Sequence, residues 1–205
     1  MSAAARPMRL VVLISGAGTN LQAILDACAS GELRAEVAAV ISDHADVMGL
    51  ERARGAGVPA IARVKRKSDE RRAYDAALAD DVARFDPDWV VLAGWMRVLS
   101  AAFVDRFPGR VINLHPALPA MFPGTRAIER ALEAYRREEI AQTGVMVHLV
   151  PDEGVDNGPV LAQAPVPIHP EDTLVELEAR VHAAEHRLLV DTLKNLVNSQ
   201  ARVAR

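Results

Sequence analysis

The stretch 10-LVVLISGAGTNLQAILDAC-28 joins an apolar run, a loop with two glycines and an amphipathic segment. Residues 10–14 are continuously apolar, which is typical of a strand that is covered on both faces of a sheet. After the loop, apolar side chains recur at i, i+3, i+4 and i+7, which predicts a helix. The apolar positions of this helix are Leu21, Ile24, Leu25 and Cys28, and Gly31 marks its end. A strand, a short loop and a helix in this order form one unit of a parallel α/β sheet.

The same alternation of short apolar runs and helical segments continues along the first half of the chain. Strands are expected at residues 37–42, 58–62, 89–93 and 110–112, and helices at residues 46–54, 68–85, 100–107 and 125–138. Ser68 is expected to cap the helix at 68–85, with Asp69 and Glu70 in the first turn, where the helix dipole favours negative charge. The buried stripe of this helix is expected to be Tyr74, Leu78, Val82 and Phe85.

The pattern changes after residue 140. Residues 144–150 and 160–168 read as two strands that pair with each other, and the acidic loop 152–158 lies between them. Thr173 and Glu176 have the spacing of a capping box, which opens a long last helix that loses its apolar stripe near Asn198. We therefore expect an α/β fold, with a single-domain, mostly parallel Rossmann-like sheet, helices on both faces and a C-terminal antiparallel strand pair. Residues 1–205 are expected to form one domain, with a core at about 8–198 and frayed termini.

The composition excludes several classes of protein. The chain has 205 residues, of which 50% are hydrophobic and 25% charged, and its net charge is −3. No basic stripe is present, which argues against a nucleic-acid partner. Apolar runs are too short for a membrane span, and the N-terminus lacks the pattern of a signal peptide, so a cytoplasmic protein is expected. Cys28 is the one cysteine, which excludes an internal disulfide, and it is expected in the core.

Asn113 and His115 stand where the strand at 110–112 gives way to a proline-rich loop. On an extended backbone, residues i and i+2 project to the same side, so an amide and an imidazole face one space. The amide donates hydrogen bonds without a charge, and the imidazole can carry a proton near neutral pH. Such a pair suits an oxyanion-stabilising and proton-transferring site. On local chemistry alone, two side chains that satisfy loop backbone groups fit equally well.

The loop Ser15-Gly16-Ala17-Gly18-Thr19-Asn20 lies between a strand and a helix N-terminus. Glycines let backbone N–H groups approach an anion, and the helix dipole favours negative charge there. The loop is neither the Gly-x-Gly-x-x-Gly pattern nor a Walker loop. We expect it to bind one phosphate monoester; a plain tight turn is the alternative.

Asp156 lies in the acidic loop at 152–158, which can reach the same end of the sheet. A carboxylate near an imidazole favours the protonated form, so Asp156 is expected to raise the pKa of His115 and give it a usable proton. A solvated acidic turn is the alternative. Residues 94–99 (GWMRVL) read as an apolar wall with one basic head, either a ligand pocket or core.

The remaining histidines carry weaker signals. His148 alternates with apolar residues in a strand and is expected to be structural. His182 and His186 are spaced i, i+4 on a helix, which a metal could use, but no third ligand is evident, so no metal site is expected. His44 and His169 suggest no site.

Four motifs taken together resemble those of the phosphoribosylglycinamide formyltransferases, a folate-dependent formyltransferase family of purine biosynthesis. They occur in the family's order, within a similarity that covers about residues 9–189. The motifs are Ser15-Gly16-x-Gly18-Thr19-Asn20-Leu21, Leu92-Ala93-Gly94-x-Met96-Arg97, Asn113-x-His115-Pro116 and Asp156-x-Gly158-Pro159. The resemblance implies a formyltransferase fold and transfer of a formyl group from the co-substrate 10-formyltetrahydrofolate to the amine of glycinamide ribonucleotide. It further implies small-molecule substrates, no metal, and a monomer or homodimer.

Site residues follow from the same resemblance, position by position. Asn113, His115 and Asp156 are similar to the family's catalytic trio. The ribonucleotide is expected at Gly18, Thr19, Asn20 and Glu185, and the folate at Arg71, Met96, Arg97, Val98, Leu99 and Asn113. The chain departs from the family's common form at Pro119, at Val145-Met146, in the length of the segment 125–143 and at His182, where a glutamine can occur. No site is therefore assigned within residues 117–148.

Two other classes of function remain open. One is another folate-dependent formyl enzyme with the same trio, such as a formyltetrahydrofolate hydrolase or a methionyl-tRNA formyltransferase. A chain of 205 residues is expected to leave no room for the further domain that these enzymes carry. The other class is a non-catalytic nucleotide- or folate-binding module, against which the joint presence of Asn113, His115 and Asp156 argues.

Overall fold

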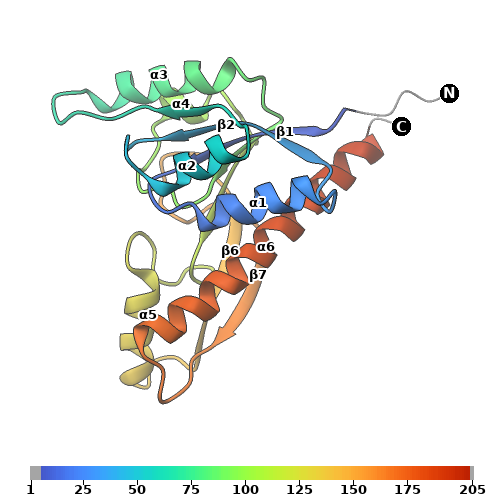
Figure 1. Ribbon diagram of the computed structural model, residues 1–205. Helices are drawn as coiled ribbons and strands as arrows, with labels where there is room; N and C mark the ends of the chain where they lie inside the picture. Colours follow the sequence, from blue (N-terminus) through green and yellow to red (C-terminus); the bar gives the residue numbers. More distant parts are fainter. Residues whose placement is uncertain (1–5, 204–205) are drawn as a thin grey trace.

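One seven-stranded mixed sheet runs through the part of the chain that the computed structural model describes (Figure 1). Residues 6–203 are described, with side chains for residues 6–199. The strand order is β3-β2-β1-β4-β5-β6-β7, in which the first five strands are parallel and the last two antiparallel. The strands are β1 (Met8–Ile14), β2 (Ala35–Ser42), β3 (Ala60–Ala62), β4 (Trp89–Leu92), β5 (Val111–His115), β6 (Gln142–Leu149) and β7 (Val160–Pro167). The predicted fold class, a mostly parallel α/β sheet with a C-terminal antiparallel pair, is confirmed.

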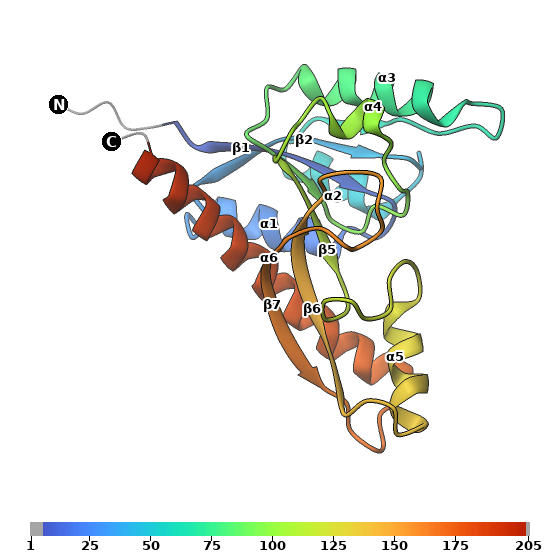
Figure 2. The same cartoon turned by 180° about the vertical axis from the view of Figure 1, so that it is seen from behind.

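Helices cover both faces of the parallel part, and Figure 2 shows the same arrangement from behind. The helices are α1 (Thr19–Ala29), α2 (Met48–Gly55), α3 (Arg71–Ala83), α4 (Ala101–Val104), α5 (Ala127–Arg136) and α6 (Leu174–Val203). Apolar side chains of α1, α2 and α6 pack together on one face, and those of α3 and α4 pack on the other. A third cluster joins α5 and the start of α6 to β6 and β7. The long helix α6 therefore ties the parallel part of the sheet to the antiparallel part.

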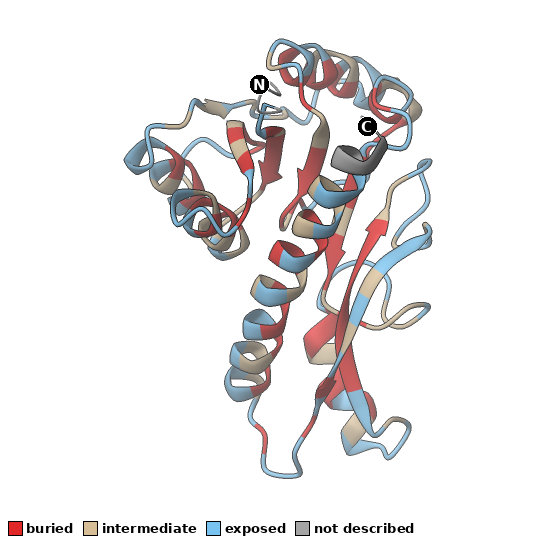
Figure 3. Cartoon of the chain, turned by 90° about the vertical axis from the view of Figure 1, so that its right-hand side faces the viewer, coloured by how far each residue is buried: buried red, intermediate tan, exposed pale blue. Residues whose placement is uncertain are grey.

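Strand β1 is the middle strand of the parallel part, and Figure 3 shows that strands inside the sheet are largely buried. From Leu10 to Ile14 its side chains are 0% exposed, which explains the continuous apolar run. Cys28 on α1 is half-buried against this core, and burial raises the pKa of its thiol to about 11. Cys28 was expected in the core, and its side chain packs against the core without being fully buried.

Hydrogen bonds join the loops at the carboxyl ends of β1 and β4. Ser15 N–H donates to the carbonyl of Gly94 over 3.0 Å, and Met96 N–H donates to Ser15 Oγ over 2.9 Å. The neighbouring strand β5 ends at the same edge because it is parallel to β4. Ligand sites of open α/β sheets lie at this edge, outside the carboxyl ends of the strands.

The predicted elements are present, but several boundaries were wrong. The strand expected at 110–112 runs to His115, because Asn113 pairs with His148 and His115 with Met146 across the antiparallel β5–β6 ladder. Asn113 and His115 therefore lie within a strand and do not follow its end.

The cap of α3 is Glu70, and the predicted cap Ser68 is wrong. The Glu70 carboxylate accepts hydrogen bonds from the N–H groups of Arg72 (2.9 Å) and Ala73 (2.7 Å). Asp69 instead accepts from Arg66 N–H in the preceding turn. Phe85 lies beyond the end of the helix and is only partly buried.

The capping box at the start of α6 is confirmed, since Thr173 and Glu176 exchange hydrogen bonds between side chain and backbone. The helix continues to Val203, past the expected end near Asn198. Residues 1–5 and 204–205, where frayed ends were expected, lie outside the described residues. No helix among the described residues is long and apolar enough to cross a membrane.

The packing of α6 can be tested at two nearby positions. Leu177 is 0% exposed in the cluster with α5, β6 and β7, whereas Val175 is 73% exposed. Leu177→Ala is expected to lower the free energy of unfolding by about 2–5 kcal/mol, because it removes buried methyl groups and leaves a cavity. Val175→Ala is the control and is expected to change it by less than about 0.5 kcal/mol. Urea unfolding followed by circular dichroism measures both, and equal losses would contradict this packing.

Candidate active site

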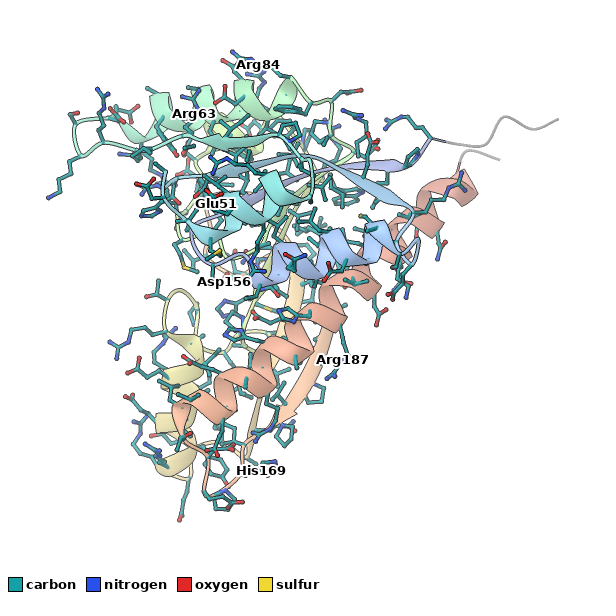
Figure 4. All side chains as sticks on the ribbon, in the orientation of Figure 1. Glu51, Arg63, Arg84, Asp156, His169 and Arg187 are labelled. Carbon is teal, nitrogen blue, oxygen red and sulfur yellow. The ribbon has the colours of Figure 1, made fainter. Side chains whose placement is uncertain are left out.

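The carboxylate of Asp156 joins the two side chains of β5. Asn113 Nδ2 donates to Asp156 Oδ1 over 2.9 Å, and His115 Nδ1 lies 3.3 Å from Asp156 Oδ2. His115 and Asp156 side chains are 4% and 11% exposed. Figure 4 labels Asp156 where the parallel part of the sheet meets the part that contains β6, β7 and α5. The structure therefore brings together the three residues that the sequence singled out.

His148 is a fourth member of this cluster. Its Nδ1 lies 2.8 Å from the carbonyl oxygen of Leu149, which can only accept, so Nδ1 carries a proton. In the neutral ring Nε2 is then an acceptor, and Asn113 Nδ2 lies 3.1 Å from it. Asn113 thus donates one N–H to Asp156 and the other to His148, so neither N–H is free for a ligand in this state.

Backbone geometry fixes the loop that carries Asp156. Asp156 has φ 51°, a left-handed conformation that is uncommon for a residue with a Cβ and is found at functional sites. A Cβ at Gly158 would lie 1.8 Å from the Leu149 carbonyl oxygen, so only glycine fits there. Glu153 accepts a hydrogen bond from Ala101 N–H over 2.9 Å and anchors the other end of the loop.

Burial controls the protonation of His115. It lowers the pKa of His115 below the ordinary value, and the Asp156 carboxylate offsets this only in part. Asp156 raises the pKa of His115, as expected, but the loss of water around the ring lowers it by more. The expectation that His115 carries a usable proton at neutral pH is therefore wrong. In the free protein at neutral pH, His115 is uncharged.

Asp156 remains ionised in the same surroundings. Burial raises the pKa of its carboxyl group, but the nearby His148 ring and the hydrogen bond from Gly124 N–H, over 2.7 Å, bring the pKa below the ordinary value. A charged acceptor is thus fixed beside a neutral imidazole.

A cavity of about 210 Å³ opens beside these polar groups. Asn113, His115, His148 and Asp156 belong to its lining. The segment 94–99 forms an apolar wall, so the pocket interpretation of this segment is supported. Met96, Val98 and Val155 at the cavity are 65%, 42% and 43% exposed, whereas Leu99 is buried. The cavity combines apolar walls with converging polar groups, as small-molecule sites do.

The two arginines expected near a folate lie in different surroundings. Arg97 lines the cavity, but its guanidinium lies 3.7 Å from the buried Asp43 carboxylate and 5.8 Å above the Tyr74 ring. Arg71 does not line the cavity, and it contacts Glu153 (3.2 Å) on the loop that carries Asp156.

The residues expected at a phosphate lie together at the start of α1. Gly18 precedes the helix in a left-handed conformation with φ 71°, and a Cβ there would lie 2.7 Å from Gly49 Cα. Asn20 Nδ2 donates over 3.4 Å to the buried carboxylate of Glu185 on α6. His182 Nδ1 lies 2.7 Å from the same carboxylate, which raises the pKa of His182. Within the described residues, no group of three or more His, Cys, Asp or Glu side chains is placed to hold a metal ion.

Two contributors were missed from the sequence. His148 was expected to be structural, yet the β5–β6 register sets it opposite Asn113. Gly124 N–H also reaches Asp156 from a segment to which no site was assigned. The Asn-x-His spacing gave no information on either, because both depend on how distant segments pair.

Comparison with known proteins identifies the family. A family model described as "Formyl transferase" matches residues 8–193. The chain belongs to the formyl transferase family. Its relatives include the phosphoribosylglycinamide formyltransferase of Escherichia coli (strain K12), which is 45% identical over 181 residues, with 88% of this chain and 83% of that protein covered. The enzyme of the same name from Schizosaccharomyces pombe is 43% identical over 200 residues, with 92% and 96% covered.

Solved structures of formyl transferases share the fold. The crystal structure of glycinamide ribonucleotide transformylase 1 from Symbiobacterium toebii has a TM-score of 0.90 and 42% identity, and covers 97% of this chain and 92% of that one. The phosphoribosylglycinamide formyltransferase of Bacillus halodurans has a TM-score of 0.85 and 38% identity, with 92% and 94% covered.

The protonation of this formyl transferase's cluster can be measured by NMR titration of the histidine rings. His115 is expected to titrate below its ordinary value of 6.5 because of burial, and Asp156→Asn is expected to lower that pKa further because it removes the main group that raises it. His182, whose pKa is raised by Glu185, is the internal reference and is expected to stay unchanged. A His115 pKa above 6.5, or one that rises in the variant, would contradict these electrostatics.

Proposed function

We propose that this formyl transferase moves the formyl group of 10-formyltetrahydrofolate to the amine of glycinamide ribonucleotide, a reaction of purine biosynthesis. The observation that carries the proposal is the contact of Asn113, His115 and Asp156 at an apolar cavity, in a chain similar to phosphoribosylglycinamide formyltransferases. Direct transfer between two bound substrates is the mechanism that suits these groups, because none of them is a cysteine or serine nucleophile.

His115 is the group that we assign to proton transfer. In its neutral form it can accept the proton that the attacking amine loses, which a protonated ring could not do. Asp156, 3.3 Å from Nδ1, then stabilises the imidazolium that forms. The imidazolium can return the proton to the leaving nitrogen. The lowered pKa of His115 therefore favours a base that acts first and an acid that acts second.

Asn113 is the donor that we assign to the formyl oxygen, where negative charge develops. Of its two bonds, the one to His148 Nε2 is easier to exchange than the one to the Asp156 carboxylate, because hydrogen bonds to charged acceptors are stronger. The bond to Asp156 would keep the amide oriented while the other N–H turns to the substrate. A donor held in this way costs little reorganisation.

We assign the cavity to the ring system of the folate, which combines flat ring faces with hydrogen-bonding edges. Met96, Val98 and Leu99 offer an apolar wall, Arg97 also lines the cavity, and Arg71 pairs with Glu153 on the loop that carries Asp156. The bound co-substrate supplies an electrophilic formyl carbon. Residues of the chain orient that carbon and exclude water from it.

The ribonucleotide is assigned to the start of α1. Gly18 and Thr19 stand at the N-terminus of α1, where backbone N–H groups and the helix dipole favour a phosphate. The Glu185 carboxylate, held by Asn20, can accept hydrogen bonds from sugar hydroxyl groups. This loop lies apart from the reacting groups, so its binding energy orients the amine.

Release of tetrahydrofolate from 10-formyltetrahydrofolate, measured with and without glycinamide ribonucleotide, tests the function. Release that depends on the ribonucleotide is expected, and His115→Ala should lower kcat by roughly 10²-fold or more. Release without the ribonucleotide would instead indicate a hydrolase, and no release would indicate a binding module. Near-normal turnover of the His115 variant would refute the mechanism.

Affinity for the ribonucleotide tests the phosphate loop. The double variant Thr19→Ala, Asn20→Ala is expected to raise the Kd for glycinamide ribonucleotide by about tenfold or more and to leave folate binding unchanged, because it removes donors at one substrate only. Gln22→Ala on the same helix is the control. The Gln22 side chain is hydrogen-bonded to Asp26 and Arg52 and is not assigned to the phosphate. Calorimetric titration gives both constants, and an unchanged Kd would remove the assignment.

A further inference from the structure

The loop between β5 and α5 has an unusual backbone. Ala120, Phe122, Gly124 and Arg126 have φ values of 63°, 48°, 81° and 57°. Three of these four residues carry a Cβ, and the left-handed conformation is unfavourable for them. Such a conformation persists where surrounding contacts hold it. The contacts that hold this loop therefore bear on the groups it presents to the site.

Arg130, on the second turn of α5, holds the middle of the loop. Its Nη2 donates to the carbonyl oxygens of Phe122 (2.6 Å) and Pro123 (2.7 Å), and its guanidinium lies 5.8 Å from the Phe122 ring centroid. Arg130 Nε is buried and has no hydrogen-bond partner within the described residues. The charge of this side chain is thus directed onto two adjacent carbonyl groups.

The carbonyl of Pro123 and the N–H of Gly124 belong to one peptide group. The described chain contains no cis peptide, so in this planar unit the C=O and N–H point in opposite directions. Arg130 binds the oxygen, and on the other side Gly124 N–H donates to Asp156 Oδ2 over 2.7 Å. A cation on the carbonyl polarises the peptide and strengthens the bond that its N–H makes.

We propose that Arg130 is a positioning residue of the active site, which fixes the Asp156 carboxylate through the Pro123–Gly124 peptide and holds the Phe122 carbonyl near His115. This inference rests on the proposed function, in which Asp156 and His115 act together. Arg130 donates hydrogen bonds to the carbonyl groups of Phe122 and Pro123 and not to the side chains of Asp156 or His115. Its effect on the two side chains therefore passes through backbone groups.

A role limited to fastening the loop to α5 would have a different signature. The titratable groups that face His115 are Asp156, on the loop between β6 and β7, and His148, on β6. The carboxylate of Asp156 and the carbonyls of Met121 and Phe122 raise the pKa of His115. Loss of Arg130 removes contacts that hold two of these three groups in place, the Asp156 carboxylate and the Phe122 carbonyl. The pKa of His115 should then fall, whereas simple loosening of the loop would lower stability and leave the pH profile in place.

The test compares Arg130→Met, Arg130→Lys and the wild-type enzyme by kcat/KM against pH in the formyl-transfer assay. In Arg130→Met the acid limb is expected to move to lower pH, with kcat reduced by about tenfold and the KM for the ribonucleotide unchanged, because the reacting groups are misplaced and the phosphate loop is not. Arg130→Lys keeps a cationic donor and is expected to recover part of kcat. Arg137→Met, at the exposed end of α5 where Arg137 pairs with Glu139, is the control.

Thermal unfolding of all four proteins separates activity from folding. An acid limb that is unchanged in a folded Arg130→Met protein, or that moves to higher pH, overturns the proposal. If Arg130→Met does not fold, the Lys variant decides: an unshifted limb and wild-type kcat with a lowered Tm would assign Arg130 to loop stability alone. A wild-type enzyme without formyl transfer would refute the proposed function and not this inference.

Discussion

One half-buried carboxylate, that of Asp156, organises the functional part of this formyl transferase. Asp156 accepts hydrogen bonds from Asn113 on β5 and from Gly124 in the loop after β5, and it faces His115 and His148. Burying an ionised carboxylate is costly unless donors surround it. The segments that supply these donors are therefore constrained together: β5, β6 and the loop 116–126 adopt positions that satisfy one charge. The left-handed backbone of Asp156, and of Ala120, Phe122 and Arg126 in the loop after β5, is the structural cost of that arrangement.

The competition between burial and charge also decides the chemistry. A carboxylate beside an imidazole suggests a protonated histidine, yet His115 is so well enclosed that desolvation has the larger effect on its pKa. The outcome is a neutral base next to a fixed anion, and the anion becomes useful when the base has taken a proton. The same enclosure gives Asn113 two well-defined partners, which orients an amide that water would otherwise leave free.

The sequence predicted the sheet well because its strands obey local rules. The apolar run in β1 is continuous since both faces of that strand are covered, and the glycine loop before α1 could be recognised from its spacing. Ser68 failed as a cap because Glu70, two residues later, offers a carboxylate to the same helix end. His148 and Gly124 could not be predicted, since each reaches the site through tertiary contacts that no local spacing encodes. The sign of the His115 pKa shift likewise required the degree of burial, which composition does not provide.

The antiparallel ladder between β5 and β6 sets the positions of the site's side chains relative to one another. Asn113 faces His148 because the two are directly paired, and a slip of one residue would turn His148 to the opposite face of the sheet. Gly158 packs against the carbonyl of Leu149, the same carbonyl that sets the proton on His148, so the turn after β6 and the tautomer of the ring depend on one group. The backbone pairing of β5 with β6 thus places His148, the Leu149 carbonyl sets the tautomer of its ring, and the ring in turn orients the Asn113 amide. The loop after β5 depends on the same arrangement, because its Gly124 N–H donates to the Asp156 carboxylate that Asn113 also binds.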